Sequence, residues 1–187
     1  LRSRVLVAGV VPPPRFGREA EVMASAAAVD ASGADLVDVS LPPRLIGPVA
    51  RGAATTVAVR AGTLDQVAAA RRAGAQVVMV PPSLIDEATG NPGDDGPALV
   101  LVVDNLADLV SARVVARRAR VPLALDSTRM PSVDAMANEA AAIAGGVRVI
   151  RTTDVRRSRR VAEVMAAILA ARRPSATAIA DQTASAS

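Results

Sequence analysis

Short apolar runs alternate with Ala-rich segments of helical length along most of this chain, and that alternation constrains its fold more than any other feature. Seven runs have the length and the continuous apolar character of strands that are buried on both faces, at positions 5–11, 36–39, 55–59, 76–80, 99–104, 121–126 and 147–151. Helices are predicted at positions 18–32, 63–73, 106–120, 132–144 and 155–172. Thr63 and Asp154 are the expected N-caps, and Gly33 and Gly74 the expected stops. Such repeated strand–helix units predict a parallel sheet covered by helices.

The number of strands leaves two α/β architectures open. Seven strands are one fewer than a (β/α)8 barrel needs and more than a small doubly wound sheet needs, and 187 residues is short of the roughly 250 of a complete barrel. The pattern is weakest at positions 81–97, which are rich in Pro, Gly and Asp and predict a short helical turn and a loop. We expect one domain over 1–173 and a disordered tail over 174–187. In either architecture, functional groups belong at the carboxyl ends of the strands.

The composition excludes most of the usual catalytic groups. The chain contains no His, Cys, Lys, Tyr or Trp, so all 22 of its positive side chains are arginine. A thiolate nucleophile, a Ser–His pair, a Schiff-base lysine and a His/Cys zinc site are therefore excluded. The net charge of +4 suits an acidic small molecule as well as nucleic acid, but a single aromatic residue, Phe16, disfavours stacking of single strands. Without cysteine or an apolar run of membrane-spanning length, we expect a cytoplasmic protein.

Polar residues that follow two of the predicted strands form the candidate site. Arg151 and Thr153 stand just before the last predicted helix, and Ser127 and Arg129 stand after the preceding strand. Guanidinium and hydroxyl groups beside free helix N–H groups are suited to binding an anion such as phosphate. The alternative is that Arg151 only neutralises a strand-end carboxylate, such as Asp126 or Asp104.

Carboxylates at the strand ends offer a second chemistry. Asp38, Asp104 and Asp126 each close a predicted strand, so a carboxylate cluster with a role in Mg²⁺ binding or as a general base is one interpretation, and helix capping and ion pairing are the other. A run of arginines at the start of the last helix is interpreted either as a surface for phosphate or nucleic acid or as a solvated face paired with acids. It comprises Arg156, Arg157, Arg159 and Arg160, with Glu163 four residues after Arg159.

Several segments resemble the dihydropteroate synthase family. The most specific is positions 145–168, GGVRVIRTTDVRRSRRVAEVMAAI, which resembles the last strand and helix of that family and keeps an arginine, Arg151, at the strand end. Positions 7–11, 33–39, 56–80 and 121–130 resemble other strands and helices of the family in the same order. The resemblance implies a pterin-binding, TIM-like (β/α) barrel with one unit reduced, near positions 81–97. It also implies an ancestral activity, the condensation of a pterin pyrophosphate with p-aminobenzoate.

The departures from the family pattern fall on the residues that would hold these substrates. Groups that bind the pterin and the pyrophosphate in the family are replaced here by Pro12–Pro14, the stretch 40–43, Arg60, Met79–Val80, Thr153, and Arg129 or Met130 in place of a lysine. Either Asp104 or Asp126 matches a family aspartate on the pterin side. A site that loses its hydrogen-bonding groups loses recognition of a polar ring, so we expect no dihydropteroate synthesis.

Three functions remain as hypotheses. The first is a non-catalytic binding or partner subunit, a pseudoenzyme of the folate-pathway family, which forms a homodimer or pairs with an active paralogue. The second is an active transferase or lyase that uses Asp104, Asp126, Arg129 and Arg151 on another phosphorylated or anionic molecule. The third is an interaction module that contacts RNA or protein through its arginines. No cofactor is expected, except Mg²⁺ if the ligand is of the pyrophosphate type.

Overall fold

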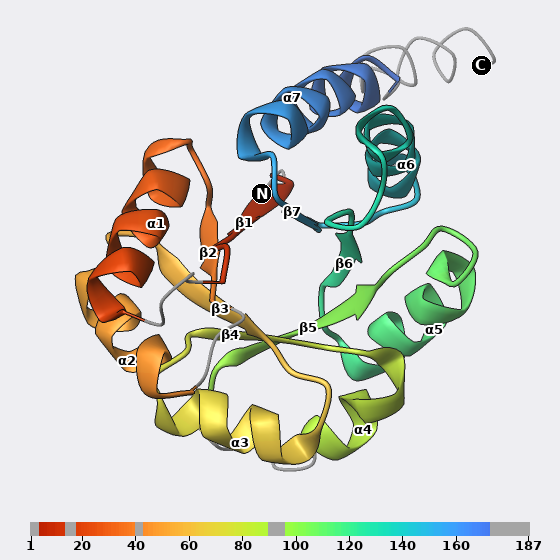
Figure 1. Cartoon of the computed structure of the whole chain (residues 1–187). Helices are drawn as coiled ribbons and strands as arrows, with labels where there is room; N and C mark the ends of the chain where they lie inside the picture. Colours follow the sequence, from red (N-terminus) through yellow and green to blue (C-terminus); the bar gives the residue numbers. More distant parts are fainter. Residues whose placement is uncertain (1–3, 14–17, 40–42, 90–95, 173–187) are drawn as a thin grey trace, which may run out of the picture.

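Seven parallel strands close into a barrel in the part of the chain that the structure describes, residues 4–13, 18–39, 43–89 and 96–172 of a computed structural model (Figure 1). Each strand pairs with the next along the chain, and β7 pairs with β1 to close the ring. The closed barrel is therefore confirmed over the open sheet. The strands are β1 (Leu6–Val10), β2 (Leu36–Asp38), β3 (Thr56–Arg60), β4 (Val77–Val80), β5 (Ala98–Val103), β6 (Leu123–Asp126) and β7 (Val149–Thr152).

Helices follow every strand and form the outer ring (Figure 1). Thr63 and Asp154 cap their helices as predicted, because each side chain accepts a hydrogen bond from the backbone N–H three residues on. Gly33 and Gly74 follow helix ends with positive φ angles, as expected for stop residues. The helices are α1 (Glu19–Ala31), α2 (Pro43–Gly52), α3 (Leu64–Arg72), α4 (Ile85–Ala88) after the 3₁₀ turn η1 (Pro82–Leu84), α5 (Leu109–Ala119), α6 (Ser132–Ala144) and α7 (Val155–Ala171).

Helix α2 was not predicted from the sequence. Gly47 and Pro48 lie inside it, and both residue types disfavour a helix interior. The helix forms because it buries Leu45, Ile46 and Val49, which are at most 5% exposed. The short helical turn predicted near positions 81–97 is confirmed, because the described residues between β4 and β5, two strands that pair directly, contain η1 and the four-residue α4.

The interior of the barrel is narrow and filled with small side chains. Alternate residues of the strands point inward and form one apolar cluster, which includes Ala8, Ala58 and Ala124, all fully buried. A closed sheet of seven strands has a smaller diameter than one of eight, so alanine fits at these central positions. The outward-facing residues of the strands pack against the helices in the larger cluster, for example Val37, Val57 and Leu101.

The predicted tail over 174–187 lies outside the described residues, as do positions 90–95 of the predicted loop and positions 40–42. Within the described residues, no helix is long and apolar enough to cross a membrane.

A larger side chain inside the barrel should destabilise the fold. We expect Ala58→Leu to lower the free energy of unfolding by about 1–3 kcal/mol, because a packed interior must distort to take the extra carbons. Ala137→Leu, on the exposed face of α6, is the matched control and should change it by less than about 0.5 kcal/mol. Urea denaturation measures both, and equal effects would show that the interior is not closely packed.

Candidate functional site at the barrel mouth

Strand alternation places four charged residues on the inner face of the barrel at its carboxyl end. Each of them lies two residues after an interior apolar residue, and side chains two apart share one face of a strand. The register supports the grouping, since Asp126 of β6 pairs with Arg151 of β7. The four residues are Asp38, Arg60, Asp126 and Arg151.

These side chains form one chain of alternating charges across the mouth. Arg151 donates from Nε to Asp38 Oδ2 at 2.5 Å and from Nη1 to Asp126 Oδ2 at 2.7 Å. Arg60 also pairs with Asp126, and its Nη2 lies 2.7 and 2.9 Å from the two carboxylate oxygens of Asp104, the residue after β5. The inner part of this network is buried, because the side chains of Asp38, Asp126 and Arg151 are at most 7% exposed.

The network fixes the ionisation of its central groups. Burial by itself raises the pKa of Asp126, but hydrogen bonds from the Thr128 hydroxyl and N–H, together with the charges of Arg151 and Arg60, outweigh it and hold that pKa below its usual value. Burial likewise acts to lower the pKa of Arg151, yet Asp38 and Asp126 raise it above its usual value. Both groups therefore stay charged, and neither is set up to exchange a proton near neutral pH.

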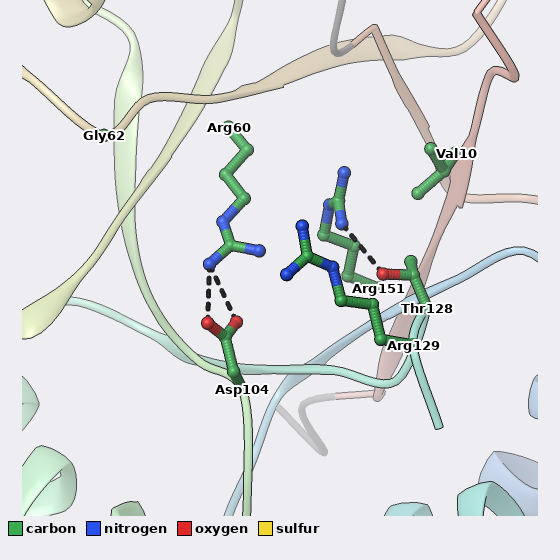
Figure 2. Close-up of a pocket in the computed structure, with 7 residues that line it drawn as sticks. All are labelled: Val10, Arg60, Gly62, Asp104, Thr128, Arg129 and Arg151. Carbon is green, nitrogen blue, oxygen red and sulfur yellow. Dashed lines mark hydrogen bonds and ion pairs between the residues drawn. The ribbon is translucent and has the colours of Figure 1, made fainter. Parts of the chain in front are cut away.

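A cavity of about 460 Å³ opens above the charged network (Figure 2). Arg129, which follows β6, is exposed and extends its guanidinium group into the cavity beside that of Arg151 (Figure 2). It forms no side-chain hydrogen bond or ion pair with the described residues, whereas Arg60 is held by Asp104 and Asp126. The cavity is lined by Val10, Arg60, Gly62, Asp104, Thr128, Arg129 and Arg151.

The structure brings together most, but not all, of the residues predicted for the site. Arg129, Arg151 and Asp104 line the cavity, and Asp126 lies directly beneath them as a partner of Arg151. The sequence also allowed Arg151 to pair with a strand-end carboxylate, and the structure shows that pairing with Asp126. The other predicted partner, Asp104, pairs with Arg60 instead.

Ser127 and Thr153 do not join this site. Ser127 is buried on the outer side of β6, where its hydroxyl donates to Glu139 Oε1 at 2.7 Å and approaches the carbonyl oxygen of Arg151 at 3.1 Å. Thr153 is exposed and lines a different cavity, near Arg156 and α1. The outward position of Ser127 could have been predicted from the alternation of side chains along a strand, because an inward Asp126 requires an outward Ser127.

Two of the four arginines at the start of α7 have separate partners. Arg157 lies 3.3 Å from Glu139 Oε1, and Arg159 donates to Asp35 Oδ2 at 2.5 Å and to the Gly33 carbonyl oxygen at 2.8 Å. Pairing with acids was therefore the right interpretation for these two residues, although Arg159 contacts Asp35 and not Glu163. In the described part of the chain, no group of three or more acidic side chains is arranged to hold a metal ion.

The fold and its strand-end cavity define a TIM-like α/β barrel of seven strands. Solved structures of dihydropteroate synthases share this fold: the enzyme of Yersinia pestis at 17% identity and a TM-score of 0.63, covering 90% of this chain and 94% of that one. The Vibrio fischeri enzyme matches at 11% identity and a TM-score of 0.65, covering 91% and 95%, and the Coxiella burnetii enzyme in complex with pteroic acid at 12% and 0.67, covering 88% and 93%. No family model and no curated protein matches the chain. The expected resemblance to dihydropteroate synthases is thus confirmed for the fold.

Acid should weaken the fold through Asp126. Because its folded-state pKa lies below the usual 3.8, its stabilisation is complete above that value and is lost as the pH falls through the lower folded-state pKa. We expect Asp126→Asn to destabilise the protein by about 3 kcal/mol at neutral pH, since it leaves buried arginine charge less compensated. The deficit should shrink as the pH falls below the usual carboxyl pKa of 3.8. Urea denaturation across this range is the measurement.

Asp134→Asn, at an exposed position of α6, is the control and should have the same stability as the unmodified protein at each pH. A deficit for Asp126→Asn that does not change with pH would contradict the assignment.

Proposed function

We propose that this protein is a non-catalytic barrel with the dihydropteroate synthase fold, which binds a small phosphorylated or otherwise anionic molecule at its mouth. The observation that carries this proposal is Arg129, an uncommitted guanidinium group that faces a cavity whose other charges are already paired. Its fork of N–H donors suits the oxygens of a phosphate or carboxylate. Thr128 and Arg60 stand beside it on the cavity wall.

Three features argue against dihydropteroate synthesis by this chain. The two buried carboxylates of the mouth, Asp38 and Asp126, are both paired with Arg151, so a pterin ring would have to break buried ion pairs to reach them. Directly beneath them the barrel holds an apolar cluster that includes Ala58 and Met79, which offers a ring no strong hydrogen-bonding group. Asp126 is held ionised, which removes it as a proton donor near neutral pH.

An active transferase or lyase is the second candidate, and Asp104 favours it. Its side chain is 62% exposed at the edge of the cavity, although Arg60 holds both of its oxygens. It is also the carboxylate that a Mg²⁺ ion accompanying a pyrophosphate ligand could reach. Turnover of a phosphorylated substrate that depends on Asp104 would support this alternative over simple binding.

Binding of inorganic pyrophosphate tests the main proposal. We expect saturable NMR shifts of the Gly62 and Thr128 amides at the mouth, with and without Mg²⁺, and a dissociation constant about tenfold weaker or more in Arg129→Ala, because a charge-assisted hydrogen bond is lost. Arg160→Ala, which removes an exposed arginine of α7, is the control and should bind as the unmodified protein does. Equal affinities for Arg129→Ala and the unmodified protein would rule out the assigned site. Product formation from pterin pyrophosphate and p-aminobenzoate would refute the non-catalytic assignment.

We also propose self-association through the last helix. Val164 and Ile168 are 58% and 40% exposed and lie one turn apart on α7, which is the kind of surface that a second copy covers. The pair Val164→Glu and Ile168→Glu should convert a dimer to a monomer in light scattering. The matched control is Val110→Glu with Val114→Glu, an exposed pair of the same spacing on α5. A monomer before any substitution, or a dimer that persists in the α7 variant, would overturn this part of the proposal.

A further inference from the structure

A second cavity of about 300 Å³ lies at the opposite end of the barrel and is ringed by arginines. Arg113 and Arg117 come from α5, Arg120 follows that helix directly, and Arg148 precedes β7. Apolar residues such as Leu123 and Ala116 complete the lining. Because the cavity lies among the amino ends of the strands, it is separate from the mouth, and we name it the basal cavity.

The arginines of the basal cavity have no acidic partner among the residues that the structure describes. All four are exposed, and none forms a side-chain hydrogen bond or ion pair with the described residues, whereas the arginines of the mouth network are paired. Arg113, Arg117 and Arg120 follow one face of the chain at spacings of four and three, at which like charges repel. The carboxyl end of α5 eases this repulsion only in part. Four converging cations therefore leave a local charge that a bound anion would neutralise.

Arg120 occupies a position that the rest of the fold gives to glycine. Helices α3, α5 and α6 end with the same hydrogen bond, from the N–H of Ala75, Val121 or Val147 to the carbonyl oxygen five residues earlier. The residue just before that N–H has positive φ in all three, and it is Gly74 after α3 and Gly146 after α6 but Arg120, with φ of 56°, after α5. Among the described residues, Arg120 is the only non-glycine with positive φ. A side chain there is strained, so its presence points to a role other than ending the helix.

We propose that the basal cavity binds a small molecule that carries two or more phosphate groups. Guanidinium groups match phosphate oxygens in geometry, and four of them call for a ligand with several negative charges. The cavity has the volume of a small-molecule site. Phosphate of this kind also occurs along nucleic acid, but arginines from α5 and from the residue before β7 line one cavity together, which favours a small ligand.

The test is a titration of isotope-labelled protein with inorganic tripolyphosphate, followed by NMR. The amides of Val121 and Gly146 report on the basal cavity, and those of Gly62 and Thr128 report on the mouth, so success or failure at one site is read independently of the other. We expect saturable shifts at Val121 and Gly146. Their absence would overturn the proposal.

Arg120→Gly separates binding from folding. We expect it to raise the melting temperature by about 2–4 °C, because it relieves the strained backbone, and to weaken tripolyphosphate binding at the basal cavity at least tenfold. Arg118→Ala removes a charge from the same turn of α5 but outside the cavity, where the arginine pairs with Asp86, and should bind normally.

Two results would count against the basal site in this comparison. Unchanged affinity in Arg120→Gly would overturn the proposal. So would duplex DNA that binds at Val121 and Gly146 with steep salt dependence and that tripolyphosphate does not displace.

Discussion

The buried guanidinium of Arg151 is the interaction on which the mouth of the barrel depends. It extends from β7 to a carboxylate of β2 on one side and to a carboxylate of β6 on the other, so it ties together strands that flank the closure of the sheet. A lysine in such a place could lose its charge, whereas arginine stays charged and offers donors in two directions. Removing it would leave Asp38 and Asp126 buried without a counter-charge, which is more costly than never having buried them. Loss of this one guanidinium group would therefore destabilise the other buried charges of the mouth.

This constraint decides where a ligand can bind. Below the charged layer the narrow barrel is filled by apolar side chains, mostly alanine and valine, and the charged side chains of the layer pair with one another. A ligand at the mouth must therefore sit above the network, against residues of the strand–helix loops. Arg129 belongs to such a loop, and because it pairs with none of the described residues, we expect its removal to leave the fold intact. The proposed binding at this end and the stability of the fold therefore depend on different arginines.

The sequence predicted the elements better than it predicted the contacts. Continuous apolar runs located all seven strands, and cap residues located the ends of several helices. Neither signal predicted α2, where tertiary burial of Ile46 and Val49 overrides the unfavourable Gly47 and Pro48. Asp38 and Arg60 could be recognised as strand-end charges, but their partners could not, because Arg151 meets Asp38 across 113 residues only once the barrel closes. Ser127 was misplaced although the period of two along β6 already directed it outward.

The distribution of charge separates the two ends of the barrel. Arg60, Arg129 and Arg151 at the mouth are matched in number by Asp38, Asp104 and Asp126, so the mouth contributes nothing to the net charge of +4. The basal cavity brings together four arginines that have no acidic partner in the described part of the chain, one of them in a backbone conformation that glycine would adopt more easily. Helix-end stability alone would favour glycine at position 120, as at 74 and 146. Functional sites of such barrels lie at the carboxyl ends of the strands, so this concentration of strain and unpaired charge at the amino ends is the basis on which we propose a separate anion site there.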